Sequence, residues 1–326
     1  MMRLLVLFSI ALGLVLSGCS SSQEVEQASA PAEVSFDHHD DQIDVFLRGE
    51  EFTTLYLSPE GPAPYFHPLR AADGTIVTRQ YPMVENVPGE STDHPHHRGL
   101  WFTHDDINGT NFWGNAPGAL NRGDIVLKSV GEIAGNSLQA DFQWMSPEGT
   151  AVLTESRTVR FAQDGDVRTL EFDLTLSAHD EAVKIGDTKE GTFAVRLAPT
   201  MREKAVDGGP GEGVIVNAEG ARGESETWGK ASPWVDYSGP IGDQIYGVAI
   251  FDHPSNPKHP TYWHVRAYGL FAANVFGEHD FFSDPERDGS ITIEPGESID
   301  FRYLVVIHPG DAEEADVASR YSSWTE

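Results

Sequence analysis

Apolar and polar residues alternate along several stretches of this sequence. In residues 138–144, 170–176 and 301–307 every second residue is apolar. Successive side chains of a β-strand point to opposite faces, so this period predicts strands with one buried face. Short segments rich in glycine, proline and acidic residues, such as "SPEGT" and "EPGES", separate the stretches and favour turns.

The remaining segments fit the same architecture. "QIYGVAIFD" and "YGLFAANVFG" are almost continuously apolar, as expected for strands covered on both faces. One helix is convincing, at the C-terminus, where Asp311 can cap "AEEADVASRYSSW". We therefore predict an all-β fold, a large antiparallel β-sandwich of the mutarotase-like supersandwich type with a short C-terminal helix. About 290 residues are too many for a small immunoglobulin-type module, so residues 36–326 are expected to form a single β-sandwich domain.

The N-terminal residues predict export and a lipid anchor. Arg3 precedes an apolar run that is shorter than the roughly 20 residues of a membrane span. The run ends in "LSGC", which resembles a bacterial lipobox with Cys19, the only cysteine, as the lipidated residue. We expect residues 1–18 to be a lipoprotein signal peptide and residues 19–35 a flexible tether. The protein is then lipid-anchored in the cell envelope, periplasmic or on the outer membrane. The alternative is an ordinary signal peptide with an incidental cysteine.

The net charge limits the class of partner. Lys and Arg total 22 against 51 Asp and Glu, which gives a formal charge of −29. Nucleic acid is bound by basic surfaces, so the composition argues against a nucleic-acid partner. Such an acidic surface is typical either of a protein exposed to high salt, where screening weakens self-repulsion, or of an ordinary secreted acidic protein.

The segment "DHPHHRGLWFTH", residues 93–104, concentrates residues that can do chemistry. Pro95 favours an extended backbone at His94, so the rings of His94 and His96 are expected on one side and that of His97 on the other. An H-x-H pair can bind a divalent metal when a third ligand joins it, or it can transfer protons near neutral pH. A loop whose histidines only bond backbone carbonyls is the third interpretation.

A second polar and aromatic segment lies far away in the sequence. In "TYWHVRAYG", residues 261–269, His264 and Arg266 alternate with Trp263. On a strand, one face would carry the polar groups and the other would pack. Two such segments suggest two walls of one pocket. We therefore predict catalytic roles for His94, His96 and His264, and substrate-binding roles for Asp93, His97, Arg98, His104, Trp113, Arg266 and Asn274.

Several long motifs resemble a known bacterial family. "DHPHHRGLWFTHDDINGTNFW", "KIGDTKEGTFAVRLAPTM", "VAIFDHPSNPKHPTYWHVRAYGLFAANVFG" and "SIDFRYLVVIHPG" resemble the PmoA-like family over about residues 40–310. The resemblance implies a β-sandwich protein of saccharide-degrading bacteria. The family label refers to methane oxygenase, whose membrane subunit crosses the bilayer several times. This sequence has no such segments, so methane oxidation and a copper site are not carried over. A weaker resemblance to mutarotases implies a histidine acid in an H-G-x-x-R-like turn, and "HHRGLW" departs from that pattern.

These observations favour a periplasm-facing lipoprotein with a His- and Arg-rich pocket that acts on or binds a carbohydrate or related polyol. An enzyme that uses histidine acid–base chemistry or a histidine-bound metal is the favoured form. The alternatives are a non-catalytic sugar-binding lipoprotein and a metal-dependent oxidoreductase. A tryptophan such as Trp113 can stack on a sugar ring while polar side chains bond its hydroxyls, although most tryptophans serve the core.

Overall fold

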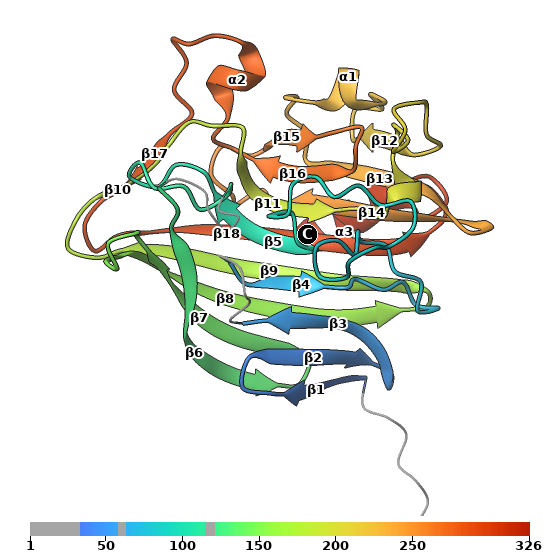
Figure 1. Cartoon of the computed structure of the whole chain (residues 1–326), viewed down its shortest axis with the longest axis horizontal. Helices are drawn as coiled ribbons and strands as arrows, with labels where there is room; N and C mark the ends of the chain where they lie inside the picture. The colour runs from blue at the N-terminus through green and yellow to red at the C-terminus, as the bar shows by residue number, and fades with distance from the viewer. Residues whose placement is uncertain (1–32, 58–62, 115–120) are drawn as a thin grey trace, which may run out of the picture. The chain divides into compact units, whose positions relative to one another are not determined.

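Two antiparallel sheets of eight strands each dominate the computed structural model, which describes residues 33–57, 63–114 and 121–326 (Figure 1). The described residues belong to one compact unit. The strand order of the first sheet is β1 (Val34–His38), β2 (Gln42–Leu47), β3 (Glu50–Tyr56), β4 (Tyr65–His67), β5 (Leu100–His104), β11 (Gly191–Arg196), β16 (Leu270–Asn274) and β15 (Tyr262–Val265). The order of the second sheet is β12 (Val214–Asn217), β13 (Trp234–Ile241), β14 (Gln244–Asp252), β18 (Ser298–Pro309), β9 (Val167–Ala178), β8 (Ala151–Asp164), β7 (Ser137–Met145) and β6 (Asp124–Ala134). A small third sheet pairs β10 (Val183–Ile185) with β17 (Ile291–Ile293). The predicted all-β antiparallel sandwich is confirmed.

Helices are short in the part of the chain that the structure describes. They are a 3-10 turn η1 (Pro199–Met201), α1 (Glu224–Thr227), α2 (Glu278–Phe282) and the C-terminal α3 (Val317–Thr325). The sequence predicted only the last of these. It begins at Val317 and not directly after Asp311, because Asp311 Oδ1 accepts the N–H groups of Glu313 and Glu314 and closes a turn before the helix.

The core lies between the inner faces of the two large sheets. Phe66 of β4 packs edge-on against Phe172 of β9 with ring centroids 5.5 Å apart, and Phe193 of β11 stacks on Tyr303 of β18 at 4.6 Å. The alternating apolar positions of the sequence are buried here, namely Leu138, Ala140, Phe142, Trp144, Leu170, Phe172, Leu174, Leu176, Phe301, Tyr303, Val305 and Ile307. Burial of this apolar surface is the main stabilising contribution.

Each large sheet also has an outer face. α3 packs on that of the second sheet, where Val317 joins Phe251 and Val306 in one apolar cluster. The outer face of the first sheet carries a separate cluster of buried side chains, made of Tyr65, Trp101, Trp113, Ala194, Leu270 and Ala272. Several of the predicted site residues, among them His96, His97, Arg98 and Trp113, lie around this second cluster.

The predicted leader falls largely outside the described residues. This applies to the signal peptide of residues 1–18, to Cys19 and to the tether as far as residue 32. Strand β1 begins at Val34, slightly before the predicted domain boundary at residue 36. In the described ranges, no helix is long and apolar enough to span a membrane.

Candidate functional site

One row of side chains crosses the outer face of the first sheet. The register of β4, β5, β11, β16 and β15 places its members opposite one another. The row consists of Tyr65, Trp101, Ala194, Ala272 and His264. Phe102 and Trp263, which are neighbours of these residues along their strands, belong to the core instead, as the alternation of a strand requires.

Two buried arginines from distant parts of the chain hold Asp93 next to this row. Arg79 Nη1 donates to Asp93 Oδ1 at 2.8 Å, and Arg196 Nη2 donates to the same oxygen at 3.0 Å. The side chains of Arg79 and Arg196 are 2% and 1% exposed, whereas that of Asp93 is 42% exposed. The carboxylate therefore compensates buried positive charge, which is costly when it is left without a partner.

The pKa of Asp93 is held well below its ordinary range. The hydrogen bond with His94 is the largest cause, partial burial opposes it, and the charges of Arg196 and Arg79 lower the pKa further. Asp93 is thus a fixed negative charge near neutral pH and not a proton donor.

The three histidines that follow Asp93 are packed against one another. His94 has a left-handed backbone with a φ of 45°, and the N–H of His97 donates to the carbonyl of His94 at 3.0 Å, which closes a turn. Arg79 Nη2 stabilises the turn by donating to the carbonyls of His94 and His97. The extended backbone predicted at His94 is therefore wrong. His97 is not separated from the other two rings, because its centroid lies 4.8 Å from that of His94 and 4.4 Å from that of His96.

The imidazole of His97 is neutral and lacks one hydrogen-bond partner. Arg196 Nη1 donates to His97 Nδ1 at 3.0 Å, so the ring proton lies on Nε2, which has no partner among the described residues. Burial keeps the pKa of His97 well below its usual value, and the nearby His96 and Arg196 lower it further. Burial also lowers the pKa of His96 to about 4. Both rings can therefore bond polar groups without carrying a charge at neutral pH.

A small pocket opens beside these rings. Its walls are Ala63, Tyr65, His96, Arg98, Trp101, Thr103 and Trp113, and its volume of about 10 Å³ has room for one water molecule. Two atoms, Thr103 Oγ1 and Trp113 Nε1, are buried without a hydrogen-bond partner in the described ranges. Buried polar atoms nearly always bond protein, water or ligand, so this pair points to a polar guest.

Two predicted site residues, His104 and Asn274, form hydrogen bonds with residues that do not line the pocket. His104 lies on the core side of β5, where its Nε2 is 2.8 Å from the carbonyl oxygen of Gly186 and its ring meets Phe276 edge-on. The buried amide of Asn274 donates to the carbonyl of Thr188 and accepts from the N–H of Phe276. The structure therefore does not bring these two side chains to the pocket.

His264 faces the same side of the sheet as the pocket but contacts other residues. Its Nδ1 accepts a hydrogen bond from Trp228 Nε1 at 3.1 Å, and burial lowers its pKa to about 3. Neighbouring strands lie roughly 4.8 Å apart, so the three strand spacings between β15 and β5 place His264 about 14 Å from Trp101 along the row. A direct role of His264 beside His94 and His96 stays a prediction.

Arg266 is connected through Tyr268 to the turn of residues 94–97, the histidine turn. Its Nε donates to Glu224 Oε1 at 2.8 Å, and its guanidinium lies 5.5 Å from the ring centroid of Tyr268. His94 stacks on that same tyrosine with ring centroids 5.5 Å apart. Arg266 therefore borders the site on the side of β15.

A metal site is not formed by the residues that the structure describes. They contain no group of three or more His, Cys, Asp or Glu side chains arranged to hold a metal ion. The ring centroids of His94 and His96 are 5.7 Å apart, and His94 Nδ1 faces Asp93 Oδ2 at 3.3 Å. The predicted metal pair thus has no third ligand in these ranges.

Arg79, Arg196 and Asp105 had no role predicted from the sequence. Both arginines lie outside the two dense motifs, and only the fold brings them to Asp93. Asp105 follows Trp101 and Thr103 at every second residue, so strand alternation could have placed it on the same face. Its pKa is raised to about 6 by burial and then by the nearby charges of Glu190 and Asp106.

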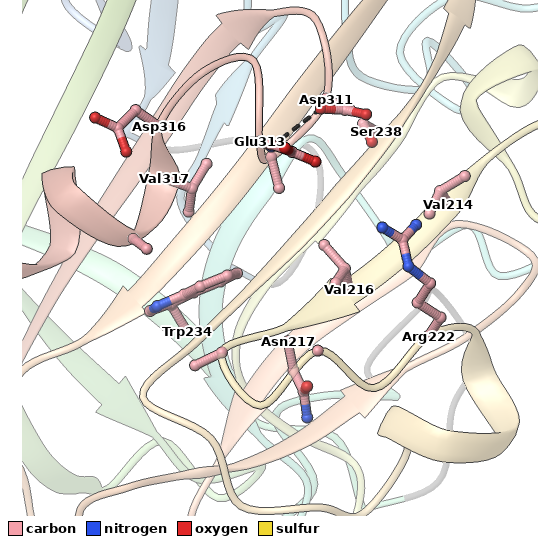
Figure 2. A pocket seen from close by; sticks show the side chains of 14 residues that line it. Val214, Val216, Asn217, Arg222, Trp234, Ser238, Asp311, Glu313, Asp316 and Val317 are labelled. Carbon is pink, nitrogen blue, oxygen red and sulfur yellow. Dashed lines mark hydrogen bonds between the residues drawn. The ribbon is translucent and has the colours of Figure 1, made fainter.

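A larger cavity, with a volume of about 340 Å³, lies on the outer face of the second sheet (Figure 2). Val216 and Trp234 contribute apolar surface, acidic side chains of the segment before α3 lie along one side, and Arg222 lies across from them. The carboxylate of Asp311 accepts hydrogen bonds from the backbone N–H groups of Glu313 and Glu314, in its own segment. None of the predicted site residues lines this cavity, so the candidate site remains the pocket on the first sheet.

The fold and the site define a class of protein, a large two-sheet β-sandwich with a polar and aromatic pocket on the outer face of one sheet. The chain belongs to a family of unknown function (DUF6807), whose model matches residues 42–322. The prediction of a PmoA-like family is therefore wrong, because the matching family model is a different one. A search among curated proteins found no match.

Solved structures match most of the chain at low identity. An α-galactosidase from Lactobacillus brevis matches 86% of this chain at 9% identity, with a TM-score of 0.37. A galactose mutarotase-like protein from Lactobacillus casei matches 84% at 10% identity and a TM-score of 0.41, covering 100% of that chain. A putative aldose 1-epimerase from Escherichia coli K12 matches 85% at 11% identity and a TM-score of 0.39, covering 99% of that chain. The match covers only 39% of the α-galactosidase. Likenesses of this size do not bear on the chemistry of the site.

Proposed function

We propose that the pocket on the outer face of the first sheet binds a carbohydrate or related polyol. The observation that carries this proposal is the combination of aromatic walls with buried polar atoms that lack partners among the described residues. Tyr65, Trp101 and Trp113 supply the walls, and Thr103 Oγ1 and Trp113 Nε1 supply an acceptor and a donor. A sugar ring presents apolar C–H groups and hydroxyls, so it matches both features.

The dimensions of the pocket suggest how such a ligand would bind. Its volume suits one hydroxyl group and not a whole ring. The ring itself would therefore lie across the mouth, in reach of the half-buried side chains of His96 and Arg98. His96 carries no charge near neutral pH, because burial lowers its pKa to about 4, so it can donate to one hydroxyl and accept from another.

Replacing His96 with alanine separates a binding role from a structural one. His96 forms no hydrogen bond with any other described residue, so we expect His96→Ala to leave the melting temperature nearly unchanged. Sugars that stabilise the wild-type protein should no longer do so, since a ligand at about 100 times its Kd adds about 2.7 kcal/mol to the free energy of unfolding. A thermal-shift screen of mono- and disaccharides measures both quantities, with the exposed His38→Ala as the matched control. A large loss of stability with unchanged sugar binding would contradict the proposal.

Acid–base catalysis on the bound sugar is the second candidate function. Asp105 favours it, since its pKa is raised to about 6 and it follows the end of β5, the strand that carries Thr103. A group with a pKa near the working pH is best able to transfer protons. Polarimetry of reducing sugars would detect catalysed mutarotation. If Asp105 transfers the proton, Asp105→Asn should abolish the activity and retain binding, whereas an inactive wild-type protein would favour the non-catalytic binder.

The lipid anchor and the envelope location remain proposals that rest on the sequence motif "LSGC". Each buried CH₂ of an acyl chain contributes about 0.8 kcal/mol to membrane affinity, so the several chains of a lipoprotein cysteine hold a protein firmly. We expect Cys19→Ser to move the protein from the membrane fraction to the soluble fraction. Fractionation followed by immunoblotting measures this. Membrane association that survives the substitution would argue for another anchor.

A further inference from the structure

We infer that the sugar bound at this pocket carries a negatively charged group, of which a uronate carboxylate is the best fit. This inference rests on the proposed function and adds the class of substrate to it. Acidic residues outnumber Lys and Arg by 51 to 22 in the chain as a whole. Around the histidine turn four arginines gather, namely Arg79, Arg98, Arg196 and Arg266, and three of them form ion pairs with Asp93 or Glu224.

The carboxylates of this region are already used by other arginines. Asp93 Oδ1 accepts from both Arg79 and Arg196, and Oδ2 faces His94. Glu224 Oε1 accepts from Arg266 Nε, and its Oε2 accepts from a backbone N–H group. Neither carboxylate lines the pocket.

Arg98 is the guanidinium that lines the pocket, and it has no such partner. Its Nε donates weakly to the carbonyl of Pro95 at 3.4 Å, and its guanidinium carbon lies 5.8 Å from the ring centroid of Tyr65. Within residues 33–57, 63–114 and 121–326, no carboxylate forms an ion pair with Arg98. Apart from the Tyr65 hydroxyl, with which the guanidinium forms a hydrogen bond, Arg98 has no side-chain partner within these same ranges, which leaves N–H groups of the guanidinium available to a ligand.

A carboxylate on a sugar ring fits this arrangement. A planar guanidinium binds a planar carboxylate through two parallel hydrogen bonds, and the packing on Tyr65 restricts its orientation. Salt screens charges beyond about 8–10 Å, so the acidic surface of the rest of the protein repels an anion here less than the arginines attract it. The neutral imidazole of His96 can then form hydrogen bonds with the hydroxyls of the same sugar ring.

The charges at the two ends of β5 determine the orientation in which an anionic sugar would bind. Arg98 lies just before the strand, whereas Asp105 and Glu190 meet at its far end, with Trp101 and Thr103 between them. A carboxylate near Asp105 would be repelled. The anionic group is therefore placed at Arg98 and the uncharged hydroxyls toward Asp105.

Calorimetric titration of acid and neutral sugars tests the inference. The probes are D-glucuronate against D-glucose and D-galacturonate against D-galactose, with glucose 6-sulfate as a sulfated sugar. We expect the uronate to bind at least about tenfold more tightly than its neutral parent, since charge-assisted hydrogen bonds are roughly twice as strong as neutral ones. Arg98→Gln should reduce uronate binding to the level of the neutral sugar. Arg222→Gln, which removes the same charge from the cavity on the second sheet, should change nothing.

The outcomes distinguish this inference from the proposed function. Equal binding of uronates and neutral sugars would overturn the inference and leave the sugar site standing. Binding of neither kind would remove both. Tighter binding of the sulfated sugar would replace the carboxylate by a sulfate, and loss of binding in Arg222→Gln would move the site to the second sheet. Circular dichroism of Arg98→Gln confirms that the fold is kept before affinities are compared.

Discussion

Acidification to about pH 5 is expected to destabilise the protein strongly, because the unfolded chain then takes up protons on histidines that burial keeps neutral in the native protein. His67 and His104 have pKa values lowered to about 4, and His264 has one lowered to about 3, in each case chiefly through burial. The pKa of the buried His97 is lowered in the same direction. In the unfolded chain each imidazole returns to a pKa of about 6.5.

The sign and size of the effect follow from proton linkage. Between about pH 6.5 and the lowered native pKa values, the unfolded chain binds more protons than the native protein, so stability falls as the pH falls. At about pH 5 each of these three histidines costs about 2 kcal/mol, together about 6 kcal/mol, against the 5–15 kcal/mol that stabilises a typical domain. His308 acts in the opposite direction, because Asp236 raises its pKa despite burial and its stabilisation is therefore present at low pH and lost as the pH rises. One such residue does not offset three.

Urea unfolding at a series of pH values measures the slope. His264→Gln keeps an acceptor for the Trp228 N–H and removes one titrating group, so its stability should depend less steeply on pH below about 6.5, by up to about 1.4 kcal/mol per pH unit. His38→Gln removes an exposed histidine from β1 and serves as the control. A midpoint that does not change from neutral pH to about pH 5 would show that these imidazoles are accessible to solvent in the native protein.

The fold was predictable because its signal is local. The positions of Leu170, Phe172, Leu174 and Leu176 follow a period of two within one short segment, and each of them is buried in the core. The start of the last helix was not predictable in this way. Asp311 has the residue type of a cap, but its carboxylate closes a turn and Val317 becomes the first helical residue. Several local structures compete for such a side chain, and the three-dimensional context selects one.

The candidate site was predictable only in part, because its charges are assembled by strand pairing. The unusual composition of residues 93–98 identified the histidine turn. Arg196 reaches it because β11 pairs with β5, and no feature of the sequence around Arg196 indicates that pairing. His104 could have been assigned correctly, since it is out of step with Trp101 and Thr103 on the same strand and so faces the core. His264 needed knowledge of strand order, because β11 and β16 lie between β15 and β5.

Loss of the Asp93 carboxylate is expected to destabilise the protein more than loss of any surface acid. Asp93→Ala leaves Arg79 and Arg196, which are 2% and 1% exposed, without the carboxylate that both contact. Breaking a buried ion pair costs about 3–5 kcal/mol, and the 42% exposure of Asp93 places the expected loss near the lower value, at about 3 kcal/mol. The turn should also loosen, because the same arginines hold the carbonyl of His94 and the ring of His97.

A matched control isolates the contribution of the buried arginines. Asp124 is 46% exposed and pairs at 2.9 Å with Arg122, which is 31% exposed, so Asp124→Ala removes a similar carboxylate from a solvent-accessible partner. An ion pair of that kind contributes about 0–1 kcal/mol. Urea unfolding of the two variants should differ by about 2 kcal/mol or more, and only Asp93→Ala should also weaken sugar binding, since Arg98 and His96 extend from the turn that Asp93 fixes. Equal losses of stability in the two variants would mean that water or another group compensates the charges of Arg79 and Arg196. In that case backbone hydrogen bonds, and not the Asp93 carboxylate, would hold the histidine turn in its conformation.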